Sequence, residues 1–274
     1  ALALGVVGLM NVQFAVKDGE VFLLEVNPRA SRTVPFVAKA TDSAIASITA
    51  RLMAGETLDA FPFRPPYENV GYDTPLPYAD PMTLADPRMP WFSVKEAVLP
   101  FARFPGVDTL LGPEMRSTGE VMGWDRSFPR AFLKAQMGAG VALPRTGRAF
   151  VSIRDADKTP TMREACEVLS TLGFTLVATR GTAAWLRAHG LDCETVNKVY
   201  EGGRTIVDRL KDGEIALVMN TTESTQAVSD SREIRTVALM DRIPYYTTAA
   251  GAHAAALAIR AREEGEVGVR SLQA

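Results

Sequence analysis

Short strands and helices alternate along the second half of the chain, and this alternation limits the fold more than any other feature. Apolar runs with strand character are each followed by a stretch whose apolar residues have helical spacing. The expected strands are residues 149–153, 174–178, 193–197, 215–219 and 244–246, and the expected helices are 161–172, 183–189, 206–211, 231–241 and 249–263. Such alternation with short loops predicts an open, mostly parallel sheet covered by helices on both faces. Sheets of this type bind ligands at the carboxyl ends of their strands.

The first half of the chain has a different pattern. Two apolar runs, residues 10–16 and 21–26, flank Asp18-Gly19, which is a strong signal for a β-hairpin. Further along, the pattern predicts a helix at 33–53, an irregular connection at 61–91, a strand at 94–99, a Pro- and Gly-rich segment at 104–123 and a helix at 128–136. The composition changes at 138–147, so we expect a first domain of residues 1–143 and a second of residues 144–274.

Charge and composition exclude several classes of protein. The 30 basic and 32 acidic side chains give a formal charge of −2, so we expect neither nucleic acid nor an anionic membrane as a partner. No apolar run reaches the roughly 18 to 20 residues of a membrane span. Two cysteines without metal-ligand spacing are typical of a cytoplasmic protein. The chain starts without Met on apolar residues that lead into a motif, and we expect this start to lie inside a catalytic domain.

Polar side chains gather on the predicted hairpin. Glu25 and Asn27 are two residues apart on one strand and face the same side, and Gln13 on the other strand can lie opposite them. Oxygen ligands of this kind suit Mg²⁺ or Mn²⁺ that is completed by nucleotide phosphates and water. Arg29 and Arg32 follow, where they can neutralise charge on a transferring phosphoryl group. The alternative is an exposed, solvated face.

Residues 24–36 read Leu-Glu-Val-Asn-Pro-Arg-Ala-Ser-Arg-Thr-Val-Pro-Phe. This string resembles the metal-binding strand of ATP-grasp ligases, and its second part is similar to carbamoyl-phosphate synthetase large subunits. The likeness continues through residues 93–101, 104–108 and 111–123, whereas residues 61–91 depart from it. The resemblance implies the end of the second ATP-grasp half, which phosphorylates carbamate. Gln13, Glu25 and Asn27 would then hold the divalent metals, Arg29 would contact ATP phosphate, and Arg32 would assist catalysis.

The same resemblance implies further ligands and partners. These are K⁺, a glutaminase small subunit, the remainder of the large subunit and a second copy of the chain. In family members that respond to ornithine, the glutamate at Glu96 helps to bind it, with Thr247 at a less specific matching position. A purely structural glutamate on a strand is the alternative.

A second polar constellation lies in the alternating region. The loops 179–182, 220–222 and 247–248 each follow an expected strand, carry Thr hydroxyls and open a helix, where free N–H groups favour an anion. Lys158 and Lys198 can add positive charge to the same rim. The alternative for each loop is an ordinary helix cap.

This region resembles the Rossmann-like, methylglyoxal-synthase-like fold, which is the allosteric domain of carbamoyl-phosphate synthetases. The resemblance places the effector phosphate at Thr179, Thr182 and Lys198, with Lys158, Asn220 and Thr222 nearby. Lysine at 198 favours a nucleotide monophosphate, UMP or IMP, over N-acetylglutamate. Arg180 departs from the family, because a histidine stands there in the enteric form.

Three functions compete at this point. The first is part of an ATP-dependent carbon–nitrogen ligase, the glutamine-hydrolysing synthetase of arginine and pyrimidine biosynthesis, with its regulatory domain. The second is a nucleotide-sensing module without catalysis. The third is a methylglyoxal-synthase-type lyase, for which Asp208 and Asp230 are the candidate acid–base residues. By resemblance the chain lacks the nucleotide-binding lysines and glycine-rich lid of an ATP-grasp domain, so we expect it not to make carbamoyl phosphate by itself.

Overall fold

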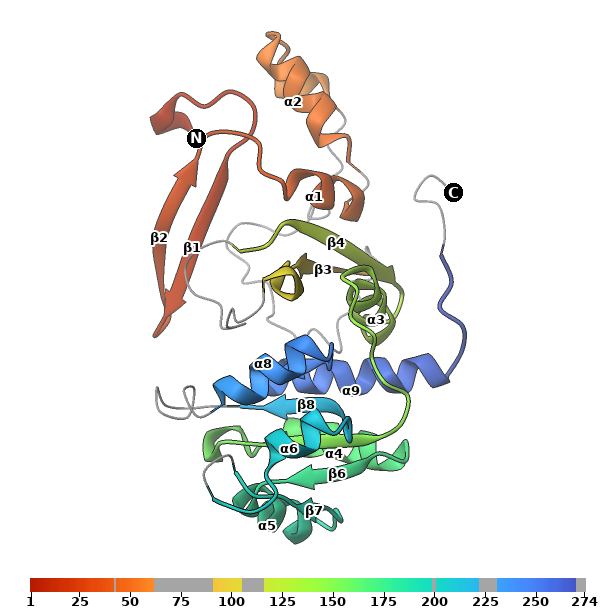
Figure 1. Ribbon diagram of the computed structural model, residues 1–274. Coiled ribbons are helices and arrows are strands. Elements are labelled where there is room, and N and C mark those ends of the chain that lie inside the picture. Colours follow the sequence, from red (N-terminus) through yellow and green to blue (C-terminus); the bar gives the residue numbers. More distant parts are fainter. Residues whose placement is uncertain (42, 62–90, 105–115, 199–200, 222–230, 270–274) are drawn as a thin grey trace. The chain divides into compact units, whose positions relative to one another are not determined.

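The computed structural model of the chain describes residues 1–41, 43–61, 91–104, 116–198, 201–221 and 231–269 (Figure 1). The chain divides into two compact units, Ala1–Met89 with Arg270–Ala274, and Pro90–Val269. Within the described ranges, no helix is both long and apolar enough to cross a membrane.

The first unit contains the expected hairpin. Strands β1 (Asn11–Lys17) and β2 (Glu20–Asn27) pair antiparallel, and the two turn residues Asp18 and Gly19 both have positive φ, at 52° and 81°. Positive φ at both positions matches the twist of paired strands and explains why an Asp-Gly pair stands there. The hairpin prediction is therefore confirmed.

The prediction of a single helix at 33–53 is wrong. Two helices occupy this range, α1 (Val34–Ala40) and α2 (Ile45–Met53). The hydroxyl of Thr41 donates to the carbonyl of Val37, and the hydroxyl of Ser43 donates to the carbonyl of Thr41. Hydroxyl side chains that bond to nearby carbonyls compete with the helical ladder, and here they accompany its interruption. Short 3₁₀ turns lie at Leu2–Leu4 and Leu58–Ala60.

The second unit starts with a hairpin and a helix. Strands β3 (Phe92–Val98) and β4 (Gly119–Asp125) pair antiparallel, and α3 (Phe128–Gly138) packs on both. A 3₁₀ turn, η3, lies at Phe101–Arg103. The Pro- and Gly-rich pattern of 104–123 did not predict a strand, but β4 begins within this segment, at Gly119. Gly123 allows the backbone of α3 to approach the strand.

The rest of this unit is the predicted parallel sheet. Its strands are β5 (Arg148–Ser152), β6 (Thr175–Ala178), β7 (Glu194–Thr195), β8 (Ile215–Asn220) and β9 (Tyr245–Tyr246). They lie in the order β7-β6-β5-β8-β9, and each neighbouring pair is parallel. The direction of winding reverses between β5 and β8, and a ligand crevice is expected outside the carboxyl ends of these two strands.

Helices connect these strands close to the expected positions. They are α4 (Pro160–Thr171), α5 (Arg180–Ala188), α6 (Ile206–Lys211), α8 (Arg232–Met240) and α9 (Ala249–Glu263), with a 3₁₀ turn, η4, at Asp155–Asp157. Helix α4 packs against α9, and α6 packs against α8. The prediction of a mixed α/β fold with a parallel sheet is confirmed.

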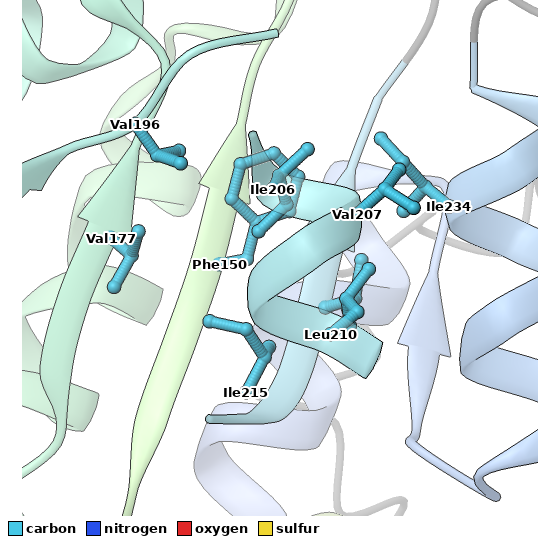
Figure 2. Packing of buried hydrophobic residues seen from close by; sticks show 9 residues of the cluster. Phe150, Val177, Val196, Ile206, Val207, Leu210, Ile215 and Ile234 are labelled. Carbon is cyan, nitrogen blue, oxygen red and sulfur yellow. The ribbon is translucent and has the colours of Figure 1, made fainter. Parts of the chain in front are cut away.

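Figure 2 shows the core between the sheet and the helices α6 and α8. Phe150, Val177 and Val218 come from three parallel strands and meet the side chains of α6 and Ile234 of α8. Phe150 is 1% exposed, and such a side chain contributes several kcal/mol, about 3 to 5, when it is fully packed. This core fixes the strand ends that carry the polar loops.

The domain boundary expected after residue 143 falls inside the second unit. Helix α3 packs against α9 as well as against its own hairpin, so the two layers belong to one compact unit. The boundary between residues 143 and 144 therefore stays a prediction.

Candidate functional site

The polar residues of the first hairpin come together as their spacing predicted. Gln13 lies directly opposite Glu25 in the β1–β2 register. The side-chain amide of Asn27 donates from Nδ2 to Oε1 of Glu25 at 2.8 Å. Three oxygen-bearing side chains thus share one side of the hairpin near the end of β2.

Their chemistry fits a divalent metal that keeps part of its shell for a ligand. Among the described residues, no group of three His, Cys, Asp or Glu side chains could form an all-protein metal cage. One carboxylate with neighbouring amide oxygens leaves several coordination positions for water and phosphate, which is the usual arrangement for Mg²⁺. To bind the ion, Asn27 would have to turn its Oδ1 toward it, because the NH₂ group of an amide donates hydrogen bonds and offers no lone pair to a metal.

Arg29 lies beside this group at the edge of an open hollow. The hollow is lined by Leu9, Met10, Asn11, Arg29, Ser31, Thr33, Val34, Val37 and Ile45. Asn11 lines the hollow and pairs with Asn27 in the strand register, so the hollow lies next to the three candidate metal ligands. The guanidinium of Arg29 donates to the carbonyl of Ala30 at 3.1 Å, and both Arg29 and Arg32 are exposed. An exposed guanidinium at this place can reach a phosphate group.

In the second unit, hydroxyl groups form a chain at the carboxyl edge of the parallel sheet. Ser152 at the end of β5 lies 3.4 Å from the hydroxyl of Thr179, which in turn donates to Thr182 at 3.4 Å. The backbone N–H of Ile153 donates to Oγ1 of Thr182 at 3.0 Å. The sheet edge and the first turn of α5 are therefore held together by the residues that were predicted to bind an anion.

The end of β8 lies next to this chain, at the reversal point of the sheet. The N–H of Thr221 donates to the carbonyl of Ser152 at 2.9 Å, and the Thr221 hydroxyl accepts from the N–H of Arg154 at 3.1 Å. Asn220 is 3% exposed, and its side chain donates to the hydroxyl of Tyr245 at 2.8 Å. Thr222 lies outside the described residues.

The two lysines reach the same edge by different routes. The ammonium of Lys158 lies 2.6 Å from Asp155 and 3.4 Å from the carbonyl of Gly181 in the first turn of α5. Its hydrogen bond lowers the pKa of Asp155. Lys198 is exposed, and its backbone N–H donates to Glu201, whose carboxylate also pairs with Arg180 at 3.6 Å. The Lys158 ammonium thus lies at the N-terminal turn of α5, and the backbone of Lys198 is linked to Arg180 of that turn through Glu201.

The remaining candidates lie elsewhere. Glu96 on β3 is half-buried and accepts a hydrogen bond from Gln136, and burial raises the pKa of its carboxyl group. Thr247 is exposed just before α9. Asp208, a candidate base for a lyase, accepts from the N–H of Thr205 and caps α6 instead. Asp230 lies outside the described residues.

Sequence reasoning missed the side chains that support these sites. Tyr245, Tyr246 and Gln136 each bond to a predicted site residue or to one another. Only the two adjacent tyrosines at a strand end gave any signal, since buried hydroxyl groups usually find a partner.

Thr182→Val is expected to lower the free energy of unfolding of the second unit by about 1 to 3 kcal/mol, because it leaves the buried N–H of Ile153 without an acceptor. Urea unfolding followed by tryptophan fluorescence would measure this, since Trp91, Trp124 and Trp185 all lie in this unit. Thr171→Val is the control, because that exposed hydroxyl only donates to the carbonyl of Glu167. Equal stability of the two variants would contradict the role of Thr182.

Comparisons with known proteins cover both polar sites. Residues 1–61 match the family described as "Carbamoyl-phosphate synthase L chain, ATP binding domain", and residues 161–247 match "MGS-like domain". The whole chain is 54% identical to the carbamoyl phosphate synthase large chain of Brucella suis and 52% identical to that of Rhizobium meliloti, over 22% of each of those proteins. It is 52% identical to the large chain of Neisseria meningitidis, over 23% of that protein. The chain thus spans less than a quarter of the length of these relatives.

Proposed function

The chain is related over its whole length to carbamoyl phosphate synthase large chains, and we propose from this that it works as the C-terminal part of such a large chain. It contributes metal and ATP-phosphate ligands to the phosphorylation of carbamate, and it adds a regulatory site for a nucleotide monophosphate. The whole enzyme is a glutamine-hydrolysing ligase of the cytoplasm, which supplies arginine and pyrimidine biosynthesis.

The catalytic part of this proposal is supported by the β1–β2 hairpin. Glu25, Gln13 and Asn27 share one side of it, and residues 1–61 match an ATP binding domain. When bound, Mg²⁺ or Mn²⁺ draws charge from the phosphate oxygens. The Glu25 carboxylate and the amide oxygens of Gln13 and Asn27 would hold the ion, and Arg29 would bind a phosphate group and orient it for transfer.

The exposed side chains of the hairpin support further partners. Phe14 is 58% exposed and Leu24 is 63% exposed, and Val16, Val21, Phe22 and Leu23 are exposed as well. A two-stranded hairpin is marginally stable unless its apolar faces are packed against other structure. We assign this surface to the remainder of the large subunit. A glutaminase small subunit and a second copy of the chain complete the proposed assembly.

The regulatory part is supported by the geometry at the carboxyl edge of the parallel sheet. The hydroxyl groups of Thr179 and Thr182 lie at the N-terminal turn of α5, as does the Lys158 ammonium. The backbone of Lys198 is linked to Arg180 of the same turn through Glu201. Free N–H groups, hydroxyl donors and two ammonium groups form a site for a phosphate monoester. UMP or IMP is the proposed effector.

Lys198→Ala is expected to weaken the binding of UMP or IMP about tenfold or more, because a charge-assisted hydrogen bond to phosphate contributes about 1.5 kcal/mol or more. Calorimetric titration of the full chain with UMP, IMP and N-acetylglutamate would measure it. Lys211→Ala is the matched control, since Lys211 ends α6 just before β8 begins, at the opposite edge of the sheet, and pairs with Glu233. Binding of no nucleotide, or equal loss in both variants, would refute the proposed regulatory site.

A second function is favoured by one observation. All the described residues of the proposed effector site lie in the unit Pro90–Val269, which has its own sheet and core. This unit can therefore bind a nucleotide without the catalytic residues of the first unit. The chain alone then acts as a nucleotide sensor, and the titration above tests this function as well.

A further inference from the structure

Gln136 connects two layers of the second unit through its side-chain amide. It lies on α3 and is 5% exposed. Its Nε2 donates to Oε2 of Glu96 on β3 at 2.8 Å, and its Oε1 accepts from the hydroxyl of Tyr246 on β9 at 3.0 Å. Both polar atoms of one buried amide are thus used by different elements. Helix α3 packs against β3, β4 and α9 (Figure 1). The Gln136 amide thus bonds to a residue of the hairpin and to a residue of the parallel sheet.

The direction of these hydrogen bonds is fixed by chemistry. An ionised carboxylate can only accept, so the Gln136 amide must turn its NH₂ group toward Glu96. Its carbonyl oxygen then faces Tyr246, whose hydroxyl must donate. Burial and the charge of Glu96 raise the pKa of Tyr246, so this hydroxyl keeps its proton. Tyr246 therefore donates to Gln136, and Gln136 in turn donates to Glu96.

The far end of this chain of bonds lies at the carboxyl edge of the parallel sheet. Tyr246 is followed by Thr247 and by Thr248, whose hydroxyl caps α9 by accepting from the N–H of Gly251 at 3.1 Å. The neighbouring Tyr245 accepts from Asn220, which belongs to the proposed effector site. A shift in the position of Tyr246 can therefore move both the start of α9 and strand β9, which contacts Asn220 of the proposed effector site.

We infer that Gln136 is a positioning residue that transmits the state of the Glu96 carboxylate to the carboxyl edge of the sheet. A ligand with an ammonium group that pairs with Glu96 competes with the Gln136 amide for the carboxylate. The amide then loses its fixed orientation, and Tyr246 loses its fixed acceptor. The ligand part of this inference rests on the ornithine-type site that the family resemblance implies at Glu96 and Thr247, whereas the coupling of Glu96 to Tyr246 rests on geometry.

The coupling is tested without any ligand by a double-mutant cycle in the full chain. Glu96→Gln and Tyr246→Phe do not remove atoms that hydrogen-bond to each other, although the charge of Glu96 acts on Tyr246 through space. The part of the non-additivity that passes through Gln136 is therefore the part that Gln136→Met removes. We expect the folding equilibrium constant, from urea unfolding by tryptophan fluorescence, to deviate at least about threefold from additivity. In a Gln136→Met background the deviation should disappear. Additive effects with Gln136 present, or an unchanged deviation in the Gln136→Met background, would overturn the inference.

Tyr245→Phe provides the matched control for this cycle. Successive side chains of a strand point to opposite faces, and the hydroxyl of Tyr245 accepts from Asn220. Its effect should be additive with that of Glu96→Gln. If Gln136→Met fails to fold, the cycle with Gln136 present and this control still decide whether Glu96 and Tyr246 are coupled.

Ornithine is the probe for the ligand part. Hydrogen exchange at the N–H of Gly251 should become at least about threefold faster when ornithine saturates the chain. Gln136→Met should remove this response while ornithine still binds. Saturation without a change in exchange contradicts the transmission. Failure of ornithine to bind removes the proposed ligand site, while the double-mutant cycle still decides the coupling.

Discussion

Glu25→Ala is expected to reduce the rate of carbamate phosphorylation by the intact large chain by about a thousandfold or more. Glu25 supplies the only carboxylate of the three metal-type side chains, and the two amides carry no charge. A divalent ion contributes several kcal/mol to the stabilisation of charge during phosphoryl transfer, and about 4 kcal/mol corresponds to a thousandfold in rate. Loss of its charged ligand should remove most of that contribution.

The measurement is ATP-dependent formation of carbamoyl phosphate from carbamate by the whole enzyme. Glu20→Ala is the control, because Glu20 lies on the same strand at the turn end and pairs with Lys17 in the register. It should leave the rate unchanged. UMP binding should survive in both variants, since the effector residues belong to the other unit. Activity retained in Glu25→Ala would refute the metal role, and loss of UMP binding would refute the separation of the two sites.

Local sequence patterns were enough to predict those turns and strands that are determined by neighbouring residues. The Asp18-Gly19 turn demands positive φ at both residues, and only a few residue pairs satisfy this at low cost. The strands of the parallel sheet were found because buried strands are continuous apolar runs. The order of these strands placed Ser152, Thr179 and Asn220 at one edge, as the rule for carboxyl ends implies.

The errors came from competition between local and tertiary effects. The apolar period of residues 33–53 continues across the break between α1 and α2, so period alone could not show it. β4 was missed because glycine usually weakens strands, whereas Gly123 is required by the close approach of α3. Contacts between distant residues decide such cases.

The side chains that support the candidate sites could not be predicted from the sequence for the same reason. Glu96 and Gln136 are 40 residues apart, and Gln136 and Tyr246 are 110 apart. No periodic pattern connects positions at such distances. The predicted residues were those that carry charge or hydroxyl groups in loops, whereas a buried glutamine inside a helix has no sequence signal of its own.

Gly123→Ala is expected to destabilise the second unit by about 3 kcal/mol or more. A Cβ atom at this position would lie 1.8 Å from the carbonyl oxygen of Ala131 and 2.5 Å from the nitrogen of Ala135. Both atoms belong to the backbone of α3, so no side chain can rotate away, and the helix itself would have to move. Overpacking of a rigid contact costs about 1 to 3 kcal/mol, occasionally more, and a clash with backbone belongs at the upper end.

The matched control is Gly119→Ala on the same strand. A Cβ atom there has open space, with no heavy atom within 4 Å, so the change should shift the free energy of unfolding by less than about 0.5 kcal/mol. Urea unfolding followed by the fluorescence of Trp124, which adjoins Gly123 on β4, would compare the two variants. Because α3 also carries Gln136 and packs on α9, the displaced helix in Gly123→Ala should weaken the coupling of Glu96 to Tyr246. Equal urea midpoints would mean that α3 can retreat from β4 at little cost, and that α3 is not the rigid support that the coupling requires.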